Sequence, residues 1–345
     1  MSTSTYKPRR TNHQPQSSIL VTGGAGYIGS HTVKELLKRG YAVVVFDNLS
    51  AGHREFVLTD KFVEGDLLDL DSLRACFDRF SFDSVLHFAA LTSVPDSVRD
   101  PQRYYQTNII AGLNLLAVML EHDVKKLVFS SSAAVYGSPQ VVPIPEDHPK
   151  NPESPYGRTK WIFEQILEDY GRAYGLRSIS LRYFNAAGSD PSGEIGEWHD
   201  PESHLIPIVL EAAQGKRNQV EIFGTDYDTP DGTCIRDFIH VSDLSEAHVL
   251  ALEHLREGAP STAYNLGTGV GHSVREVVDV CRAVTNLKIR TIEATRRPGD
   301  LPRLLADSRN AHKELGWNPK HPELETIVRT AWDWMTHGQG TPAKT

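Results

Sequence analysis

A tyrosine and a lysine four residues apart, Tyr156 and Lys160, are the pair in this sequence best suited to acid–base chemistry. Four-residue spacing places both side chains on one face of a helix. The sequence predicts such a helix, because Ser154 can cap it, Pro155 suits its first position and an apolar stripe follows. An ammonium group beside a phenol favours the phenolate, so Tyr156 is predicted to exchange a proton near neutral pH. Such a pair is common by chance, so its meaning depends on the residues around it.

A glycine-rich loop lies upstream, between a short apolar strand predicted at residues 18–21 and a helix. Gly23, Gly26 and Gly29 give this loop G-x-x-G-x-x-G spacing. At a strand-to-helix junction, glycines permit a tight turn, the approach of a pyrophosphate to the backbone, and close helix–strand packing. A second apolar run ends at Asp47, whose carboxylate can accept hydrogen bonds from an adenosine ribose. The three residues after Asp47 carry no cation for a 2′-phosphate, so the sequence favours NAD over NADP.

A bound dinucleotide beside the Tyr156–Lys160 pair predicts a definite chemistry. The dinucleotide can exchange a hydride with a substrate carbon while the tyrosine exchanges a proton with the attached oxygen. Transfer of the hydride and the proton together interconverts an alcohol and a ketone.

The elements that must position these residues alternate between apolar strands and helices. Further strands are predicted at 42–46, 61–66, 84–90, 126–132 and 178–184, and the main helical segments at 31–38, 102–122 and 157–174. This alternation predicts an α/β fold with a Rossmann-type doubly wound parallel sheet, which binds ligands at the carboxyl ends of its strands. Small or polar residues follow those ends, and Asp66 is expected to reach the adenine edge.

The length of 345 residues suffices for such a sheet and a second, smaller unit. We predict a disordered polar tail over residues 1–17 and a NAD-binding domain over residues 18–185. Residues 186–340 are predicted to form mainly a smaller mixed α/β C-terminal domain that binds the substrate.

The composition argues against several classes of function. A net charge of −8 disfavours a nucleic-acid-binding surface, and no apolar run approaches the length of a membrane span. The three cysteines, Cys76, Cys234 and Cys281, are far apart, which argues against a disulfide framework and favours the reduced cytoplasm. None of the 15 histidines stands at ligand spacing with a cysteine or another histidine, so no metal site is predicted.

Longer motifs in this chain resemble those of a known family. Residues 22–31, 130–137, 154–160 and 182–185 look like the extended short-chain dehydrogenase/reductase family. Four further motifs resemble, in the same order, those of the nucleotide-sugar 4-epimerases within that family, at residues 190–196, 231–240, 264–271 and 296–300. The resemblance begins near residue 18 and extends into the C-terminal region.

The resemblance implies reversible 4-epimerisation of UDP-glucose and UDP-galactose through a 4-keto intermediate, with tightly bound NAD. It extends this expectation to the corresponding N-acetylhexosamines. The implied partners are a UDP-sugar and a second copy of the chain, in a homodimer that packs the helices at 102–122 and 157–174 together. Residues 235–255 are expected to return to the NAD-binding domain, as they do in the family.

The resemblance also implies a role for individual residues. Tyr156 matches the acid/base, Lys160 the residue that tunes it and binds the nicotinamide ribose, and Ser132 a partner of the substrate hydroxyl. The expected cofactor contacts are Gly23, Gly26, Tyr27, Ile28, Gly29, Asp47, Asn48, Asp66, Leu67, Ala89, Ala90, Asn108, Ser130, Tyr156, Lys160 and Tyr183. The expected substrate contacts are Ser132, Tyr156, Asn185, His204, Leu205, Phe223, Arg236, Arg297, Asp300 and Leu304.

One of these positions bears on the choice of sugar. Leu304 matches a pocket position at which the resembling enzymes that exclude a 2-acetamido group carry a tyrosine. Leucine is smaller than tyrosine, so we expect activity on UDP-N-acetylgalactosamine in addition to UDP-galactose. Packing in an ordinary core is the competing interpretation of Leu304.

Three alternatives remain beside this interpretation. A UDP-arabinose/UDP-xylose 4-epimerase would share every motif named above. A nucleotide-sugar 4,6-dehydratase needs carboxylates at the places where this chain has Ala133 and Ala134. A non-catalytic dinucleotide sensor or scaffold would tend to lose the Tyr156–Lys160 pair, which this chain keeps together with Ser132.

Overall fold

The computed structural model describes residues 17–297 and 299–338, so the tail predicted at 1–17 falls outside the described residues except for its last position. The strands are β1 (Ser18–Thr22), β2 (Val43–Asp47), β3 (Phe62–Glu64), β4 (Phe82–His87), β5 (Lys126–Ser130), β6 (Arg177–Tyr183), β7 (Asn185–Ala187), β8 (Val220–Phe223), β9 (Ile235–His240), β10 (Thr262–Leu266), β11 (Gly271–Ser273), β12 (Thr291–Ala294) and β13 (Arg303–Leu304). The α-helices are α1 (Tyr27–Lys38), α2 (Leu70–Arg79), α3 (Val94–Arg99), α4 (Pro101–Tyr105), α5 (Ala111–Glu121), α6 (Pro155–Tyr174), α7 (Leu205–Ala213), α8 (Val241–Arg256), α9 (Val274–Thr285), α10 (Arg309–Glu314) and α11 (Leu324–His337). The short turns are η1 (Arg54–Phe56), η2 (Gln106–Ile110) and η3 (Ala133–Val135).

The main sheet has seven strands in the order β10-β6-β5-β4-β1-β2-β3, and every neighbouring pair is parallel. The predicted Rossmann-type doubly wound sheet is therefore confirmed. The chain order reverses between β1 and β4, and the glycine loop follows β1 at this point. Ligands of such sheets bind where the order reverses, outside the carboxyl ends of the strands.

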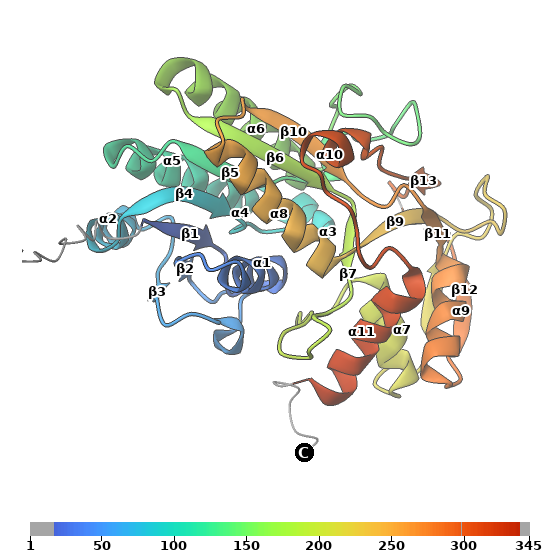
Figure 1. Cartoon of the computed structure of the whole chain (residues 1–345). Helices are drawn as coiled ribbons and strands as arrows, with labels where there is room; N and C mark the ends of the chain where they lie inside the picture. Colours follow the sequence, from blue (N-terminus) through green and yellow to red (C-terminus); the bar gives the residue numbers. More distant parts are fainter. Residues whose placement is uncertain (1–16, 298, 339–345) are drawn as a thin grey trace, which may run out of the picture.

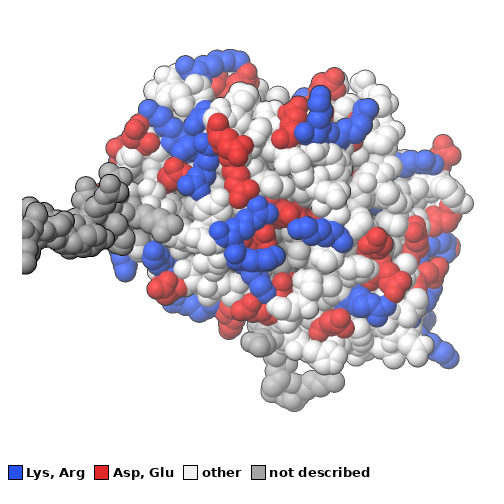
Figure 2. Space-filling view, in the orientation of Figure 1, with Lys and Arg blue, Asp and Glu red and all other residues white. Residues whose placement is uncertain are grey.

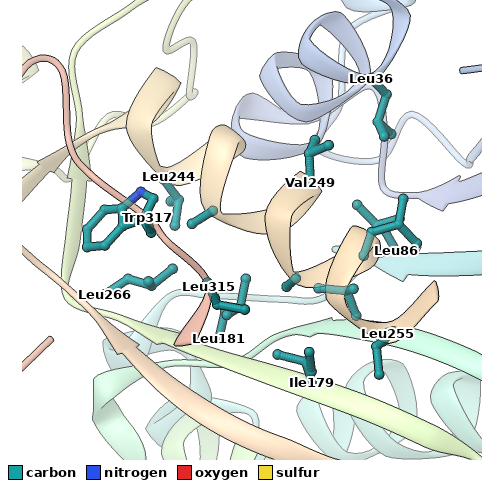
Figure 3. Packing of buried hydrophobic residues seen from close by; sticks show 14 of the residues in the cluster. Leu36, Leu86, Ile179, Leu181, Leu244, Val249, Leu255, Leu266, Leu315 and Trp317 are labelled. Atoms are coloured by element: carbon teal, nitrogen blue, oxygen red, sulfur yellow. The ribbon is translucent and has the colours of Figure 1, made fainter. Parts of the chain in front are cut away.

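Helices cover both faces of this sheet, because alternate side chains of each buried strand point to opposite sides. Ile19 and Val21 of β1 join the cluster beneath α1 and α8, which Figure 3 shows at close range. Leu20, between them, joins the cluster beneath α2, α5 and α6. Figure 1 shows the sheet between these layers, with the second unit at the right.

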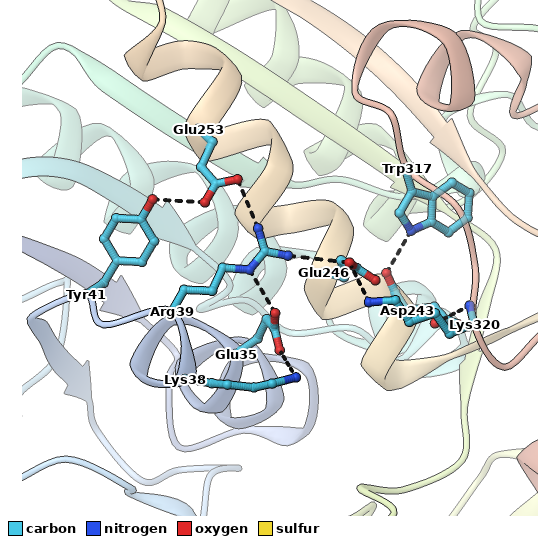
Figure 4. A network of polar contacts seen from close by, with 9 residues as sticks. All are labelled: Glu35, Lys38, Arg39, Tyr41, Asp243, Glu246, Glu253, Trp317 and Lys320. Carbon is cyan, nitrogen blue, oxygen red and sulfur yellow. Dashed lines mark hydrogen bonds and ion pairs between the residues drawn. The ribbon is translucent and has the colours of Figure 1, made fainter.

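The chain returns to this first unit after leaving it. Helix α8 packs beside α1, and Arg39 of α1 forms ion pairs with Glu253 at 2.9 Å and Glu246 at 3.5 Å on α8 (Figure 4). Strand β9, which precedes α8, pairs instead with β7, β11 and β13 outside the main sheet. Strand β10 adds the edge strand beside β6, and the buried Trp317 donates its indole N–H to Asp243 O at 2.9 Å. The returning segments therefore reach beyond residues 235–255.

The second unit consists of helices around a small core. Buried residues of α7, α9 and α11, among them Leu210, Val277 and Val328, form this core together with β8 and β12. The four short strands β7, β9, β11 and β13 join the two units.

The helix predicted at 102–122 is divided into α4, the π-helical turn η2 and α5. The turn holds Asn108, whose buried amide accepts from Leu91 N at 2.8 Å and donates to Leu91 O and Thr159 Oγ1, both at 3.0 Å. A π-turn changes the direction of the side chains that follow it and is frequent at functional sites. Here it allows one amide to connect α6 with the loop after β4.

Acidic and basic side chains are interspersed on the face that Figure 2 shows. The three cysteines are buried free thiols. Each helix within the described ranges is too short or too polar to serve as a membrane span.

Candidate active site

A cavity of about 1750 Å³ opens at the carboxyl ends of the main sheet and extends to the second unit. Every residue expected to contact cofactor or substrate lines this cavity, with the exception of Asn108. Asn108 instead lies behind the wall, where it holds Leu91 and Thr159. Residues from the sheet, α6, α7 and β13 thus meet in one space although they lie far apart in the sequence.

The three glycines of the loop serve different purposes. Gly23 has φ +74, and a Cβ there would lie 2.5 Å from Ala89 N. A Cβ at Gly29 would lie 2.1 Å from Gly23 O, so the start of α1 packs directly on the loop. At Gly26, the N-cap residue of α1, the nearest atom to a Cβ would be 3.4 Å away, which leaves its cavity face open. This is the shape that a pyrophosphate requires at a helix N-terminus, so the loop fits a dinucleotide.

Two carboxylates follow β2 and β3 at the predicted positions. Asp47 accepts hydrogen bonds from Ala25 N at 2.9 Å and Leu49 N at 2.8 Å, and it therefore also holds the glycine loop to β2. Burial raises the pKa of Asp47, and these two hydrogen bonds oppose that shift. Asp66 accepts from Asn48 Nδ2 at 2.9 Å. The carboxylate acceptors at this end of the cavity suit hydrogen bonds from ribose hydroxyls and the adenine amino group.

Helix α6 begins as the sequence predicts. The Ser154 side chain accepts from Gly157 N at 3.1 Å, and Pro155 occupies the first turn. Tyr156 and Lys160 lie on the buried side of this helix, with 7% and 3% of their surfaces exposed. The Lys160 ammonium lies 5.8 Å from the centre of the Tyr156 ring, and it donates to Ser130 O at 2.8 Å.

The acid–base properties of this pair differ from the expectation. Burial raises the pKa of Tyr156 to about 12, although a hydrogen bond with Ser132 acts in the opposite direction. Burial also lowers the pKa of Lys160 to about 7, against the attraction of Glu164. The protein residues alone therefore favour the neutral phenol, because desolvation outweighs the neighbouring amine. Among the protein residues, Lys160 therefore does not offset the burial of the Tyr156 phenol.

A row of hydroxyls lies next to this pair. Ser130 Oγ and Tyr183 Oη are 2.7 Å apart, and Ser132 follows at the end of β5. Ala133 and Ala134, which also line the cavity, come directly after Ser132. Neither alanine can transfer a proton.

A buried ion pair behind α6 escaped the sequence analysis. Glu164 and Arg182 have side chains only 6% and 5% exposed, and their closest atoms are 2.5 Å apart. Ser131 Oγ donates to Glu164 at 2.5 Å, and Arg182 also donates to Tyr136 Oη at 2.9 Å. The available signal was a carboxylate one turn after Lys160, next to the apolar residues Phe163 and Leu167. This group fixes the helix that carries Tyr156 to strands β5 and β6.

The far wall of the cavity carries two arginines. Arg236 donates to Leu301 O at 2.7 Å and lies 3.5 Å from Asp300. The Arg297 guanidinium lies 4.1 Å from the centre of the Phe223 ring. Both arginines line the cavity, so their charge is available to an anionic ligand.

Two further predicted contacts belong to the strands of this wall. Asn185 donates its amide to Asp237 O at 2.8 Å and thereby ties β7 to β9. Leu304 pairs with Arg236 between β13 and β9, and it lines the cavity while packing beside Val135 and Tyr136. Leu304 is therefore a wall residue as well as part of a small apolar cluster.

The remaining predicted contacts, His204 and Leu205, begin α7. His204 belongs to a group with Glu197, His199 and Glu202, which the spacing analysis missed. Burial lowers the pKa of both histidines, but the nearby carboxylates of Glu197 and Glu202 outweigh it and raise the pKa of His199 to about 9 and of His204 to about 10. The two carboxylates therefore affect the protonation of both imidazole rings more than burial does.

Comparison with known proteins adds to this geometry. The sequence pattern of the NAD dependent epimerase/dehydratase family matches residues 19–267. A UDP-glucose 4-epimerase of Halalkalibacterium halodurans is 53% identical over 330 residues, which cover 95% of this chain and 99% of the relative.

Two solved structures are similar over nearly their full length. One is UDP-glucose 4-epimerase from Brucella ovis in complex with NAD, with a TM-score of 0.90 and 49% identity over 92% of this chain and 97% of the other. Another is UDP-glucose 4-epimerase from Bifidobacterium longum in complex with NAD⁺ and UDP, with a TM-score of 0.88 and 39% identity over 93% of this chain and 98% of the other.

Proposed function

Because the chain belongs to the NAD dependent epimerase/dehydratase family, we propose that it is a UDP-glucose 4-epimerase that interconverts UDP-glucose and UDP-galactose with tightly bound NAD. The observation that carries this proposal is the single cavity. It brings Tyr156, Lys160 and Ser132 next to the glycine loop at one end and exposes Arg236 and Arg297 at the other. A dinucleotide and a nucleotide sugar fit these two ends.

The catalytic roles follow from chemistry and position. Bound NAD supplies the acceptor and donor of the hydride at the sugar C4. Tyr156 takes the proton of the 4-hydroxyl and later returns it, and Ser132 shares the hydrogen bond to that oxygen. Lys160 lies one helical turn away and binds the nicotinamide ribose. Since burial holds the pKa of Tyr156 at about 12, a positively charged group beside the phenol would make proton removal easier.

The far wall of the cavity would hold the nucleotide part of the substrate. Arg236 and Arg297 suit the diphosphate of a UDP-sugar, and Phe223 offers an aromatic face on the same wall. An anchored nucleotide leaves the 4-keto sugar free to turn and present its other face. Asn185, His204, Leu205 and Asp300 complete the proposed substrate contacts.

The alternatives fit the site less well. A dehydratase requires additional acid and base groups after Ser132, where Ala133 and Ala134 line the cavity. The retained Tyr156, Lys160 and Ser132 argue against a sensor without catalysis. UDP-arabinose and UDP-xylose would make the same nucleotide contacts as UDP-galactose. Competition assays between these substrates distinguish a pentose epimerase from a hexose epimerase.

We extend the proposal to the organisation of the protein. The NAD-binding unit comprises residues 18–185 with the segments that return to it, and the remainder is mainly the UDP-sugar-binding unit. A homodimer is proposed through α5 and α6, supported by the 48% exposed Ile110 at the start of α5 and the 53% exposed Tyr174 at the end of α6. A cytoplasmic location is proposed from the three free thiols. A monomer in light scattering at micromolar concentration would contradict the dimer.

Substitution of Tyr156 tests the catalytic assignment. Tyr156→Phe removes only the hydroxyl, so turnover of UDP-galactose should fall by about 100- to 10,000-fold. Bound NAD, measured after denaturation, and UDP affinity should remain near those of the wild type. The matched control is Tyr174→Phe, at the exposed end of the same helix, which should retain full turnover. Near-normal turnover of Tyr156→Phe would refute the assignment.

A further inference from the structure

Four potential metal ligands converge on the segment between β7 and α7. They are Glu197, His199, Glu202 and His204, and one ligand atom of each lies within 4.8 Å of all the others. His199 Nδ1 lies 3.4 Å from Glu197 and 3.5 Å from Glu202. His204 Nδ1 lies 3.0 Å from Glu197 and 2.8 Å from Glu202. Both imidazoles thus turn the same nitrogen towards the same two carboxylates.

Pairwise hydrogen bonds account for only part of this arrangement. Glu197 has a side chain only 4% exposed, and its Oε1 makes no hydrogen bond despite the two nearby imidazole nitrogens. His199 Nδ1 is likewise buried without a hydrogen-bond partner. His204 Nδ1, by contrast, does form a hydrogen bond with Glu202 Oε1 at 2.8 Å, and that oxygen also accepts from the backbone N–H groups of Ser203 and His204. Glu197 Oε1 and His199 Nδ1 are therefore two buried polar atoms that still lack a partner within the group.

The spacing of these atoms matches a tetrahedral metal site. Bonds of about 2.0–2.1 Å to imidazole nitrogen and carboxylate oxygen place neighbouring ligands about 3.3–3.4 Å apart. The separations from His199 to Glu197 and Glu202, 3.4 and 3.5 Å, are close to this value. Those from His204, 3.0 and 2.8 Å, are shorter and would lengthen when the ion binds. Two nitrogens and two oxygens suit Zn²⁺, whereas Mg²⁺ and Ca²⁺ prefer oxygen ligands alone.

We propose that Glu197, His199, Glu202 and His204 bind one divalent transition-metal ion, with Zn²⁺ as the best fit. When the ion binds, any proton on either imidazole Nδ1 is released to solvent, and no electron is transferred. With all four ligands supplied by protein, the site is structural rather than catalytic.

The location indicates what such an ion would stabilise. The segment that carries the ligands rests on the NAD-binding unit through several contacts of its own. Tyr27 Oη donates to Gly188 O at 2.6 Å, His53 Nε2 lies 3.0 Å from Trp198 O, and Lys34 pairs with Glu194 at 2.8 Å. His204 and Leu205 then enter the cavity wall at the start of α7. An ion here would fix this wall of the cavity relative to α1.

Metal analysis of the untagged, NAD-loaded protein tests the proposal. After dialysis against EDTA, one equivalent of Zn²⁺ should bind per chain and raise the melting temperature, whereas Mg²⁺ and Ca²⁺ should not. Co²⁺ in place of Zn²⁺ should give the intense visible absorption of a four-coordinate ion. Both readouts are independent of enzymatic turnover.

Variants locate the ion. His199→Gln and Glu202→Gln should each lose the bound Zn²⁺, the Co²⁺ spectrum and the metal-dependent rise in melting temperature. The control is His272→Gln, because His272 pairs with Glu276 at 2.6 Å and lies outside the group of four ligands. It should bind Zn²⁺ like the wild type. Circular dichroism establishes that each variant is folded.

Two results would overturn the proposal. The first is wild-type protein that binds no stoichiometric Zn²⁺ and shows no change in melting temperature, which would make the group an ion-pair cluster of protonated histidines. The second is Zn²⁺ binding that both ligand variants retain, which would place the ion elsewhere. The wild-type measurement decides the matter even if a variant fails to fold.

Discussion

The buried pair of Glu164 and Arg182 gives a prediction whose size follows from the structure. The pair joins α6, which carries Tyr156 and Lys160, to β6 of the main sheet. Arg182 donates to the Glu164 carboxylate at 3.0, 3.2 and 2.5 Å, and both side chains are almost fully buried. Burial lowers the pKa of Arg182, but the pairing with Glu164 outweighs it and raises that pKa, so the guanidinium remains charged.

Glu164→Gln keeps the shape of the side chain and removes its charge. Arg182 would then be a buried cation without a counter-charge, and breaking a buried pair in this way costs about 3–5 kcal/mol of unfolding free energy. Arg182→Met should cost a similar amount, because the Glu164 carboxylate is left unpaired. The double variant should cost less than the sum of the single variants by about 2 kcal/mol or more, because neither charge remains buried alone.

Urea unfolding of the NAD-saturated proteins, followed by circular dichroism, measures these costs at unchanged m-value. The matched control is Glu121→Gln. Glu121 pairs with Arg74 at 2.8 Å, but their side chains are 42% and 45% exposed. An exposed pair of this kind is worth about 1 kcal/mol or less. If Glu164→Gln costs no more than Glu121→Gln, or if the two single effects simply add, the argument from burial is refuted.

Two further predictions concern the ends of the cavity. In Gly29→Ala the new methyl group would lie 2.1 Å from Gly23 O, so the protein should lose thermal stability. In Gly26→Ala the nearest contact is at 3.4 Å, so this variant should fold normally but retain less NAD. Equal melting temperatures and equal amounts of bound NAD in the two variants would contradict this division. Leu304→Tyr fills the sugar side of the wall, so it should abolish turnover of UDP-N-acetylgalactosamine and largely spare UDP-galactose. A wild type inactive on the acetamido sugar, or a variant that loses both activities, would show that Leu304 is not a gate.

The parts of the fold that local sequence determines could be predicted. Strand β1, the glycine loop and the end of β2 at Asp47 follow from short apolar runs and glycine spacing. The start of α6 follows from Ser154 and Pro155, whose capping preferences are local. The division of the helix at 102–122 could not be predicted, because the π-turn depends on the contacts of Asn108 with Leu91 and Thr159.

The residues that line the cavity could be predicted from the sequence, but their pKa values could not. Spacing indicated Tyr156 and Lys160, yet their pKa values depend on desolvation that no spacing reveals. Glu164 and Arg182 were missed because a buried charge is recognisable only with its partner in place. The group around His199 was missed for a similar reason, since its ligands do not follow a familiar spacing and converge only in three dimensions.

The most direct test of the proposed function follows one hydrogen atom. Purified protein is incubated with UDP-galactose in D₂O without added NAD, and the products are examined by NMR. The proposal predicts UDP-glucose that retains protium at C4, because the C4 hydrogen leaves as a hydride and returns to the same carbon without exchange with solvent. Absence of UDP-glucose, or deuterium at C4, would contradict it.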